Sequence, residues 1–316
     1  MKVADLDTIK GALEGVDLTP LIEAGFDAYS AGRATVPPIG ELLMEEGEVH
    51  IKYGCISGDP FYVIKIASSF HGNPARGLPP GNGMMLLFSQ ESGEVVAVLH
   101  DRAYLTDLRT ALAGAIGAKY LAPAHVRCIG IMGSGVQARM QLEHLAPVTA
   151  CRDALVWGRS KENLEKYSSD MAASGFAIET TQDADEIGAR CNLIVTTTPA
   201  TVPLLSAGQI RPGTHITAIG SDTPDKQELD AEILARADVV VADSIEQCHL
   251  RGEIARAMEA EKIRADELVE IGDIIAGRAR GRTAEDQITV FDSTGVAVQD
   301  MMISRAVYEQ LRGTKD

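Results

Sequence analysis

Hydrophobic and polar residues alternate differently in the two parts of the chain. Up to about residue 122, short apolar runs are separated by Gly, Pro, Asn and Asp, which predicts antiparallel strands joined by hairpins. Two helices are predicted in this part, over residues 18–31 and 105–121, with Thr106 as the N-cap of the second. The predicted strands cover residues 48–53, 61–67, 84–89 and 95–99, and the clearest turn is at Ser92 and Gly93.

After Pro123 the pattern becomes one of alternating strands and helices. Nearly continuous apolar runs without polar alternation are typical of parallel strands that helices cover on both faces. The pattern therefore predicts an α/β protein with a parallel sheet in its second part, a domain boundary near residue 122 and a last helix from about Val296. The runs lie at residues 126–132, 154–158, 176–180, 193–198, 215–220, 239–244 and 288–293.

Composition and charge narrow the class of partner. A length of 316 residues suggests two domains, and 45% hydrophobic residues suffice for a sizeable core. The net charge of −16 argues against a nucleic acid partner, because affinity for nucleic acid rests on Lys and Arg that neutralise phosphates. No apolar run approaches the ~20 residues of a membrane span, and acidic residues near the N-terminus argue against a signal peptide.

Cysteine and histidine spacing gives no indication of a disulfide framework or a metal centre. The five cysteines are scattered, odd in number and without a CxxC pair, which predicts reduced thiols in a cytoplasmic protein. The seven histidines form no HxH or HxxxH pair, so no metal site is predicted.

A glycine motif follows the first strand of the second part. Residues 133–138 read GSGVQA and fit G-x-G-x-x-A between a predicted strand and a predicted helix. The first glycine permits a tight turn, the second lets the backbone approach a pyrophosphate at the helix N-terminus, and the small last residue permits close packing. The motif predicts a Rossmann dinucleotide-binding domain, and the alternative is a tight turn without a ligand. The candidate cofactor-binding residues are Gly133, Gly135, Val136, Gln137 and Ala138.

The end of the next predicted strand indicates which dinucleotide is bound. An NAD site carries Asp or Glu about 20 residues after the motif, where the acid holds the ribose hydroxyls. Here the strand is followed by Arg159, Ser160 and Lys161, with no acid. Because Arg pairs with phosphate through two parallel hydrogen bonds, these residues favour the 2′-phosphate of NADP(H), with NAD(H) as the alternative. The competing interpretation is that Arg159 and Lys161 are solvated charges at a helix start.

Three charged residues are candidates for chemistry. Lys65 lies in an apolar strand and Arg109 lies on an apolar helix. Because burying an unpaired charge costs free energy, each side chain either contacts an anionic ligand or forms a structural ion pair. Asp222 follows a predicted strand at the sheet edge where ligands bind, so it either transfers a proton or forms an Asx turn or helix cap. Another predicted strand ends on the same edge with Thr196, Thr197 and Thr198. These hydroxyls either contact the cofactor or are ordinary hydroxyls at a strand end.

Together these motifs resemble those of the ornithine cyclodeaminase / mu-crystallin family of NAD(P)-dependent enzymes. The resemblance covers nearly the whole chain and rests on Lys65 and on residues 105–111, 133–138, 220–229 and 294–300. It implies a Rossmann NAD(P)-binding domain over residues 123–295. It also implies an α+β substrate-binding and dimerisation domain over residues 1–122 plus about 296–316, and hence a homodimer.

The same resemblance implies roles for individual residues. Lys65 and Arg109 would hold a substrate carboxylate, and Asp222 would handle the proton of an amine or imine. Lys65 and Asp222 are therefore the candidate catalytic residues. Further candidates for substrate binding are Asn82 and Val296, and a further candidate for cofactor binding is Ser221.

Members of this family catalyse several reactions. They cyclise ornithine, reduce cyclic imino acids, dehydrogenate alanine, reduce iminosuccinate or, in mu-crystallin, bind thyroid hormone. The cyclodeaminases resemble one another in an Arg upstream of the Lys and in a Thr within the Gly-Leu segment. This chain has neither, because it reads ELLM at residues 41–44 and GLPPGN at residues 77–82.

The sequence therefore predicts an NAD(P)H-dependent oxidoreductase acting on C=N or C–N bonds of a small 2-imino or amino acid. Both a ketimine or cyclic imino acid reductase and an amino-acid dehydrogenase fit this description, and a cyclic imino acid is the first candidate substrate. One alternative is an ornithine cyclodeaminase that uses bound NAD to convert ornithine into proline and ammonia. The other is a mu-crystallin-like protein that binds the cofactor and a small ligand.

Overall fold

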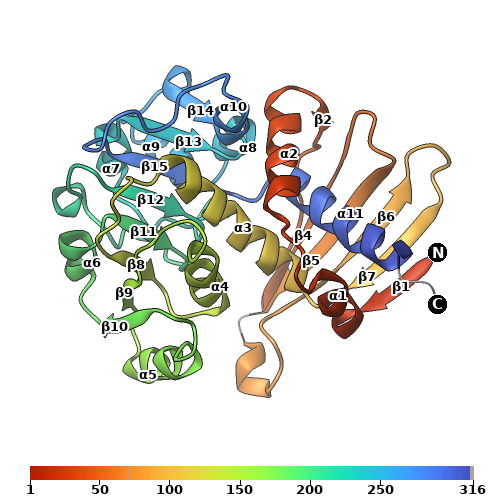
Figure 1. Ribbon diagram of the computed structural model, residues 1–316, viewed down its shortest axis with the longest axis horizontal. Helices are drawn as coiled ribbons and strands as arrows, with labels where there is room; N and C mark the ends of the chain where they lie inside the picture. Colours follow the sequence, from red (N-terminus) through yellow and green to blue (C-terminus); the bar gives the residue numbers. More distant parts are fainter. Residues whose placement is uncertain (71, 314–316) are drawn as a thin grey trace. The chain divides into compact units, whose positions relative to one another are not determined.

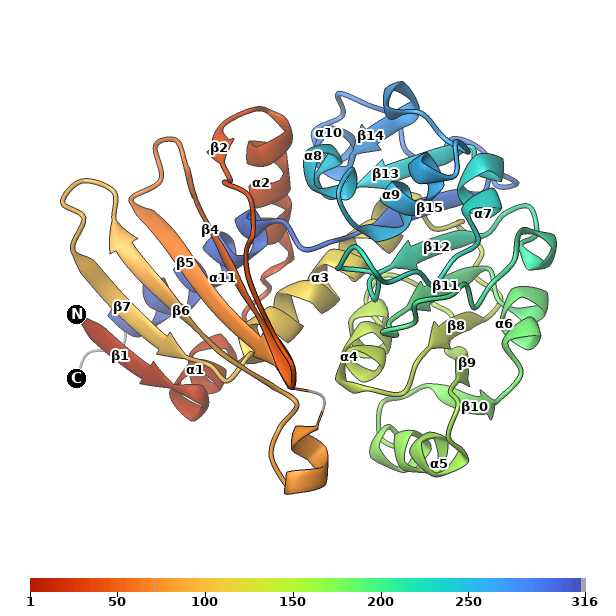
Figure 2. The same cartoon turned by 180° about the vertical axis from the view of Figure 1, so that it is seen from behind.

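The computed structural model describes residues 1–70 and 72–313, and it divides into two compact units (Figure 1 and Figure 2). The first unit contains residues 1–109 together with the chain from Val296 onward, and the second contains residues 110–295. The division falls inside helix α3 (Tyr104–Leu121), whereas the apolar pattern of the sequence places a boundary near residue 122.

Within the described residues, a seven-stranded sheet forms the centre of the first unit. Its strands lie in the order β1-β7-β6-β5-β4-β2, and β3 pairs with β4. The four predicted strands pair antiparallel as expected, and so do β2 and β3 with β4, whereas β1, which the sequence pattern did not predict, runs parallel to β7. The strands are β1 (Lys2–Asp5), β2 (Ala34–Thr35), β3 (Gly40–Met44), β4 (Gly47–Ile56), β5 (Phe61–Ser69), β6 (Gly81–Ser89) and β7 (Val95–His100).

Helix α11 (Ala297–Gly313) covers one face of this sheet together with α1 (Leu6–Leu13) and α2 (Thr19–Ser30), as Figure 1 shows. Successive side chains of a strand point to opposite faces. On β5, Val63 and Lys65 therefore share the face that contacts α11 and are buried, whereas Ile64 and Ile66 lie on the other face and are partly exposed. A short 3-10 turn, η1 (Asn73–Arg76), lies between β5 and β6.

Within the described residues, the second unit is built on an eight-stranded parallel sheet. Its strands lie in the order β10-β9-β8-β11-β12-β15-β13-β14. The first five, numbered by their appearance in this unit, follow the order 3-2-1-4-5 of the dinucleotide-binding doubly wound fold. They are β8 (Ile129–Met132), β9 (Asp153–Trp157), β10 (Ala177–Thr181), β11 (Leu193–Thr196) and β12 (His215–Ala218), and the others are β13 (Val239–Ala242), β14 (Leu268–Glu270) and β15 (Thr289–Asp292).

Two apolar cores, one on each face, bury this sheet. Leu193 and Val195 of β11 belong to one core, whereas Ile194 between them belongs to the other. Burial on both faces explains why the strands read as continuous apolar runs. The helices of this unit, besides the end of α3, are α4 (Val136–Leu145), α5 (Lys161–Asp170), α6 (Ala184–Arg190), α7 (Ala231–Arg236), α8 (Ile245–Cys248), α9 (Gly252–Glu259) and α10 (Ile271–Ile275), with 3-10 turns η2 (Ala207–Gln209) and η3 (Ala265–Glu267).

The predicted strands and helices of both parts are confirmed, but the start of α3 differs. The helix begins at Tyr104, so Thr106 lies inside it and is not the N-cap. The side chain of Asp101 accepts the Leu105 N–H instead, at 2.8 Å. The sequence pattern missed the helix α1 and the strands β1, β2, β3 and β14. Most residues of these strands are exposed or half-buried, so they carry little apolar periodicity.

Candidate active site

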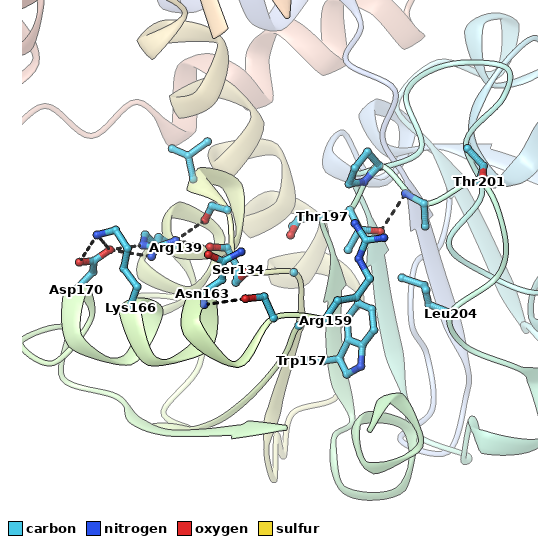
Figure 3. A pocket seen from close by; sticks show the side chains of 18 of the residues that line it. Ser134, Arg139, Trp157, Arg159, Asn163, Lys166, Asp170, Thr197, Thr201 and Leu204 are labelled. Atoms are coloured by element: carbon cyan, nitrogen blue, oxygen red, sulfur yellow. Dashed lines mark hydrogen bonds and ion pairs between the residues drawn. The ribbon is translucent and has the colours of Figure 1, made fainter. Parts of the chain in front are cut away.

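A cavity of about 930 Å³ opens at the carboxyl ends of β8, β9 and β11 in the second unit (Figure 3). Its walls are the loops that follow these strands, at residues 133–136, 157–160 and 197–202, together with side chains from α4 and α5. Strands β8 and β11 are neighbours at the point where the strand order reverses. In open α/β sheets this reversal is where ligands bind.

The glycine motif forms the turn between β8 and α4. Gly133 has φ +123, and a Cβ there would lie 2.5 Å from Thr197 Oγ1, so the position requires glycine. Gly135 is the N-cap residue of α4, and a Cβ built on it meets nothing within 4 Å. Because Gly135 lines the cavity, this open space lets a ligand approach the helix N-terminus. Ala138 is fully buried where α4 packs on the sheet. The turn therefore fits a dinucleotide pyrophosphate.

The loop after β9 brings Arg159 and Ser160 to the same cavity. Ser160 is the N-cap of α5, since its hydroxyl accepts the Asn163 N–H at 3.3 Å. Arg159 is exposed and lines the cavity beside Trp157 (Figure 3). Charged side chains among the described lining residues are three cations and one carboxylate, Arg139, Arg159, Lys166 and Asp170.

The carboxylate of this cavity wall is already paired. Asp170 Oδ2 lies 2.7 Å from Arg139 Nη2, and Asp170 Oδ1 lies 3.0 Å from Lys166 Nζ. Arg139 also donates to the Gly135 carbonyl at 3.0 Å, so it stabilises the glycine turn. The remaining charge of the wall is positive, which suits a phosphate.

Five of the predicted cofactor-binding residues, all within the described part of the chain, lie outside the cavity lining. Gln137 bonds to Gln141 at 3.3 Å, and the exposed Lys161 lies 3.8 Å from Glu165. The other three have buried side chains that contact protein: Ala138, Thr196 and Ser221. The predicted residues that do line the cavity are Gly133, Gly135, Val136, Arg159, Ser160, Thr197 and Thr198.

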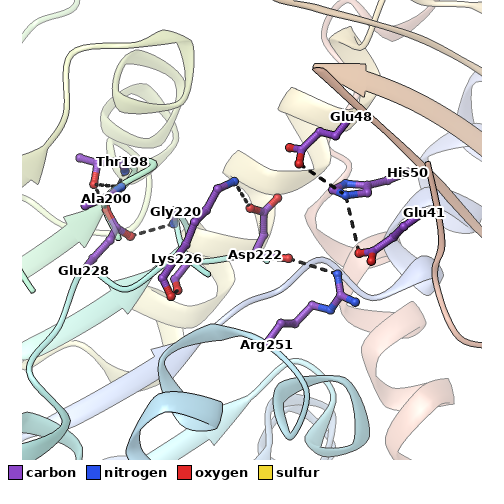
Figure 4. Close-up of polar contacts among 11 residues, drawn as sticks. Glu41, Glu48, His50, Thr198, Ala200, Gly220, Asp222, Lys226, Glu228 and Arg251 are labelled. Carbon is purple, nitrogen blue, oxygen red and sulfur yellow. Dashed lines mark hydrogen bonds and ion pairs between the residues drawn. The ribbon is translucent and has the colours of Figure 1, made fainter. Parts of the chain in front are cut away.

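Asp222 lies in the loop after β12, on the sheet edge that also bears the cavity (Figure 4). Its Oδ1 lies 2.6 Å from Lys226 Nζ, and its carbonyl accepts from Arg251 Nη1 at 3.4 Å. No helix follows directly, because α7 begins only at Ala231 and Asp230 caps it. Asp222 is therefore a partly exposed carboxylate that pairs with Lys226, and it does not cap a helix.

Glu228 joins the ends of β11 and β12, and the sequence reasoning missed it. It is fully buried, and its carboxylate accepts four hydrogen bonds from Thr196, Thr198 and Gly220 (Figure 4). Burial raises the pKa of Glu228 to about 7, although these four donors act in the opposite direction. Its position in the 220–229 motif was the available signal in the sequence.

The first unit contains a buried cluster around Lys65 and Arg109. Lys65 Nζ lies 3.0 Å from the carboxylate of Asp300 on α11, and Arg109 Nε lies 3.1 Å from the same carboxylate. Arg109 Nη1 also donates to Gln299 Oε1 at 3.0 Å. All four side chains are at least nine-tenths buried. Lys65 and Arg109 thus converge on one acid, and two positive charges face one negative charge.

A third buried cation, Lys52, lies directly across from Lys65 in the pairing of β4 and β5. Burial lowers the pKa of Lys65 to about 7, with the charges of Arg109 and Lys52 acting in the same direction and Asp300 opposing them. The sequence reasoning missed Lys52, Gln299 and Asp300. An acid inside the apolar run of α11 was a signal for Asp300, whereas Lys52 sits in an ordinary alternating strand.

The other predicted substrate residues of this unit have different surroundings. Asn82 is exposed on β6, and its Oδ1 accepts the Gly83 N–H at 2.8 Å. Val296 is fully buried at the start of α11. On the β3–β4 hairpin, His50 Nε2 lies 3.7 Å from Glu41 and 4.0 Å from Glu48 (Figure 4), a contact that the sequence reasoning did not anticipate.

Metal-binding clusters and membrane-spanning helices are both absent from residues 1–70 and 72–313. No set of three or more His, Cys, Asp and Glu side chains in these ranges is arranged to bind a metal ion. No helix in the same ranges has the length and apolar character needed to cross a membrane.

Comparison with known proteins extends over the whole chain. The model of the ornithine cyclodeaminase/mu-crystallin family matches residues 2–315. Alanine dehydrogenase of Archaeoglobus fulgidus is 39% identical over 289 residues, 91% of this chain and 88% of that protein. An archaeal alanine dehydrogenase dimer with bound NAD has a TM-score of 0.90 at 33% identity, over 100% of this chain and 98% of that one. A Thermococcus litoralis Δ1-pyrroline-2-carboxylate reductase in complex with NADH and L-proline has a TM-score of 0.91 at 27% identity, over 99% and 98%.

Proposed function

Because this chain belongs to the ornithine cyclodeaminase/mu-crystallin family, we propose that it is an NAD(P)(H)-dependent oxidoreductase acting on the C=N or C–N bond of a small 2-imino or amino acid. The observation that carries the proposal is the cavity at the strand-order reversal, into which the glycine turn and the N-terminus of α4 open. The bound dinucleotide supplies or accepts the hydride. The residues of this chain bind the two molecules and hold or move the proton.

The dinucleotide is held by the second unit in this proposal. Backbone N–H groups at Gly135 and Val136 bind the pyrophosphate, because a helix N-terminus attracts anions. Arg159 and Ser160 bind the adenosine ribose end. We favour NADP(H), since Arg159 follows β9 where NAD-binding folds carry an acid, and a guanidinium matches a phosphate with two hydrogen bonds. The related structures with NAD or NADH make NAD(H) the competing outcome.

The substrate carboxylate is bound by Lys65 and Arg109 in the first unit. Asp300 offsets part of the positive charge of this cluster, and the remaining positive charge attracts a carboxylate. Asp222 holds or moves the proton of the imine or amine nitrogen at its Oδ atoms, and Lys226 pairs with that carboxylate. General acid–base action of this kind contributes about 10²–10⁴-fold to the rate. Asn82 and Val296 are the further substrate contacts in this proposal.

The first unit is proposed as the substrate-binding and dimerisation domain and the second as the Rossmann domain. The sheet face opposite α11 carries partly exposed apolar side chains, and the rings of Tyr62 and Phe88 stack on it at 4.8 Å. A second copy of this chain covers that face in the proposed homodimer, as an archaeal alanine dehydrogenase of this family is a dimer. All five cysteines are thiols, which suits the reducing cytoplasm as the proposed location.

The decisive experiment is an imine-reduction panel with the purified protein. Loss of absorbance at 340 nm is measured with NADPH and with NADH against pyrroline-2-carboxylate, piperideine-2-carboxylate and several 2-oxo acids with ammonia or methylamine. Turnover with at least one cyclic or linear 2-imino acid is expected. An absence of turnover with every member, in protein that binds the dinucleotide, would overturn the oxidoreductase proposal. Ornithine converted to proline and ammonia without net cofactor turnover would replace it with a cyclodeaminase.

Two variants test the assigned residues. Asp222→Asn should lower kcat by about 10²-fold or more while dinucleotide affinity is retained. Arg159→Ala should raise the Kd for NADPH by about tenfold or more and leave that for NADH within about twofold, because only NADPH carries the 2′-phosphate. Lys161→Ala is the matched control, since Lys161 pairs with Glu165 outside the cavity. Equal effects of Arg159→Ala on both cofactors would refute the NADP(H) assignment.

A further inference from the structure

Glu228 lies at the junction of two loops that the proposed function uses separately. Thr198 belongs to the cavity wall after β11, and Gly220 precedes Asp222 in the loop after β12. Glu228 itself does not line the cavity, because its side chain is fully buried behind both loops. We propose that Glu228 is the positioning residue that holds the dinucleotide-binding wall and the Asp222 loop in one fixed arrangement. The inference rests on the proposed function.

The hydrogen bonds of Glu228 divide evenly between its two carboxylate oxygens; three come from the end of β11 and one from the end of β12. Oε1 accepts the Thr198 N–H at 2.6 Å and the Thr198 hydroxyl at 2.7 Å. Oε2 accepts the Thr196 hydroxyl at 2.7 Å and the Gly220 N–H at 2.9 Å. A carboxylate can accept all four, whereas an amide would direct an NH₂ group at donors. This geometry therefore needs a hydrogen-bond acceptor at both oxygens of residue 228.

The two loops also pack closely against each other at Gly220. A Cβ on Gly220 would lie 2.2 Å from the Thr198 carbonyl and 2.5 Å from Glu228 Oε2, so no larger residue fits. Thr197 extends the series, since its N–H and its hydroxyl both bond to the Met132 carbonyl at 2.9 Å. The ends of β8, β11 and β12 are thus connected in one chain of hydrogen bonds.

The backbone of Glu228 is also held by hydrogen bonds. Its backbone N–H and that of Leu229 donate to the carboxylate of Glu253 on α9, at 2.7 and 3.1 Å. Its carbonyl accepts the Leu204 N–H at 2.7 Å, and Leu204 lines the cavity. Every polar group of Glu228 therefore has a partner in the loops or in α9. Such complete satisfaction of a buried acid gives a rigid support for the groups in front of it.

The test compares Glu228→Gln with a control that damages the fold elsewhere. Asn192 is buried at the opposite ends of β8 and β11, where it accepts the Arg127 N–H and donates to the His125 carbonyl. Asn192→Ala should lower the Tm but leave the Kd for dinucleotide within about twofold. Glu228→Gln should raise that Kd, measured by fluorescence titration with NADPH and NADH, by about tenfold, the factor that corresponds to one lost hydrogen bond.

Turnover measured at saturating dinucleotide distinguishes an effect on the Asp222 loop from an effect on dinucleotide binding. Glu228→Gln should also lower kcat by tenfold or more there, because Gly220 no longer holds the Asp222 loop. A Kd within twofold of wild type, with a Tm loss like that of Asn192→Ala, would overturn the proposal. A raised Kd with unchanged kcat would refute the connection to Asp222. Failure of the wild-type protein to bind any dinucleotide would instead overturn the proposed function.

A second pair of variants covers the case in which Glu228→Gln does not fold. Thr196 is fully buried and outside the cavity lining, and its hydroxyl donates only one of the four bonds. Thr196→Ser keeps this hydroxyl and should bind dinucleotide like wild type, whereas Thr196→Val should raise the Kd about threefold or more. Equal Kd values for the Ser and Val variants would refute the proposal.

Discussion

The protonation state of Lys65 should control how tightly the protein binds a carboxylate. Burial, with the charges of Arg109 and Lys52, lowers the pKa of Lys65 to about 7. Only the ammonium form attracts a carboxylate strongly. For a pKa of about 7, the protonated fraction falls from about 0.9 at pH 6 to about 0.1 at pH 8, so carboxylate affinity should fall about tenfold over this interval.

Two neighbours of Lys65 should move this midpoint in opposite directions. Lys52→Met removes a like charge from the facing strand, which raises the pKa of Lys65 and moves the midpoint up by about one unit. Asp300→Asn removes the carboxylate 3.0 Å from Nζ, which lowers the midpoint by about one unit or more. Lys65→Arg should make the profile flat, because a guanidinium keeps its charge throughout this range.

Calorimetric titration of pyruvate into the dinucleotide-bound protein, from pH 6 to pH 9 and without amine, measures this directly. A 2-oxo acid has its carboxyl pKa well below this range, so the ligand does not titrate. Circular dichroism of each variant confirms that it is folded. A flat wild-type profile, or the same midpoint in Lys52→Met and Asp300→Asn, would refute the assignment of this pH dependence to Lys65.

Three further predictions concern stability and assembly. Burial raises the folded-state pKa values of Glu228 and Glu253 to about 7 and about 8, so the stability that these two groups contribute is complete below about pH 4.5 and is lost as pH rises to about 8. Urea unfolding should show that the free energy of unfolding falls by a few kcal/mol over this interval. An equally steep fall in Glu253→Gln would contradict this prediction. Gly220→Ala should lower the free energy of unfolding by about 1–3 kcal/mol through overpacking. Gly208→Ala is the control, because a Cβ there meets nothing within 4 Å, and equal urea midpoints for the two variants would refute the steric argument. Leu86→Asp on the open sheet face of the first unit should yield monomers in light scattering after gel filtration, because it places a charge in the proposed dimer interface, and an intact dimer would exclude that face.

The elements that the sequence predicted correctly are those with local physical causes. The strands β8, β9, β11, β12 and β13 read as apolar runs because both faces of the sheet are buried there. The turn at Gly133 was predicted because its backbone conformation and close approach permit only glycine. The strands β1 and β14 were missed, since such short strands depend on pairing with β7 and β13, which lie far away in the sequence.

For the candidate site, the amino-acid sequence by itself determined which side chains are unusual, and the tertiary structure decided what they contact. A cation inside the apolar run of β5 is visible in the sequence because burying a charge is costly. Its partner Asp300 lies 235 positions away and reaches Lys65 only through the packing of α11 on the sheet. Glu228 reaches Thr196 in the same way, across 32 positions. Such contacts depend on packing between distant segments, which no local pattern of residues specifies.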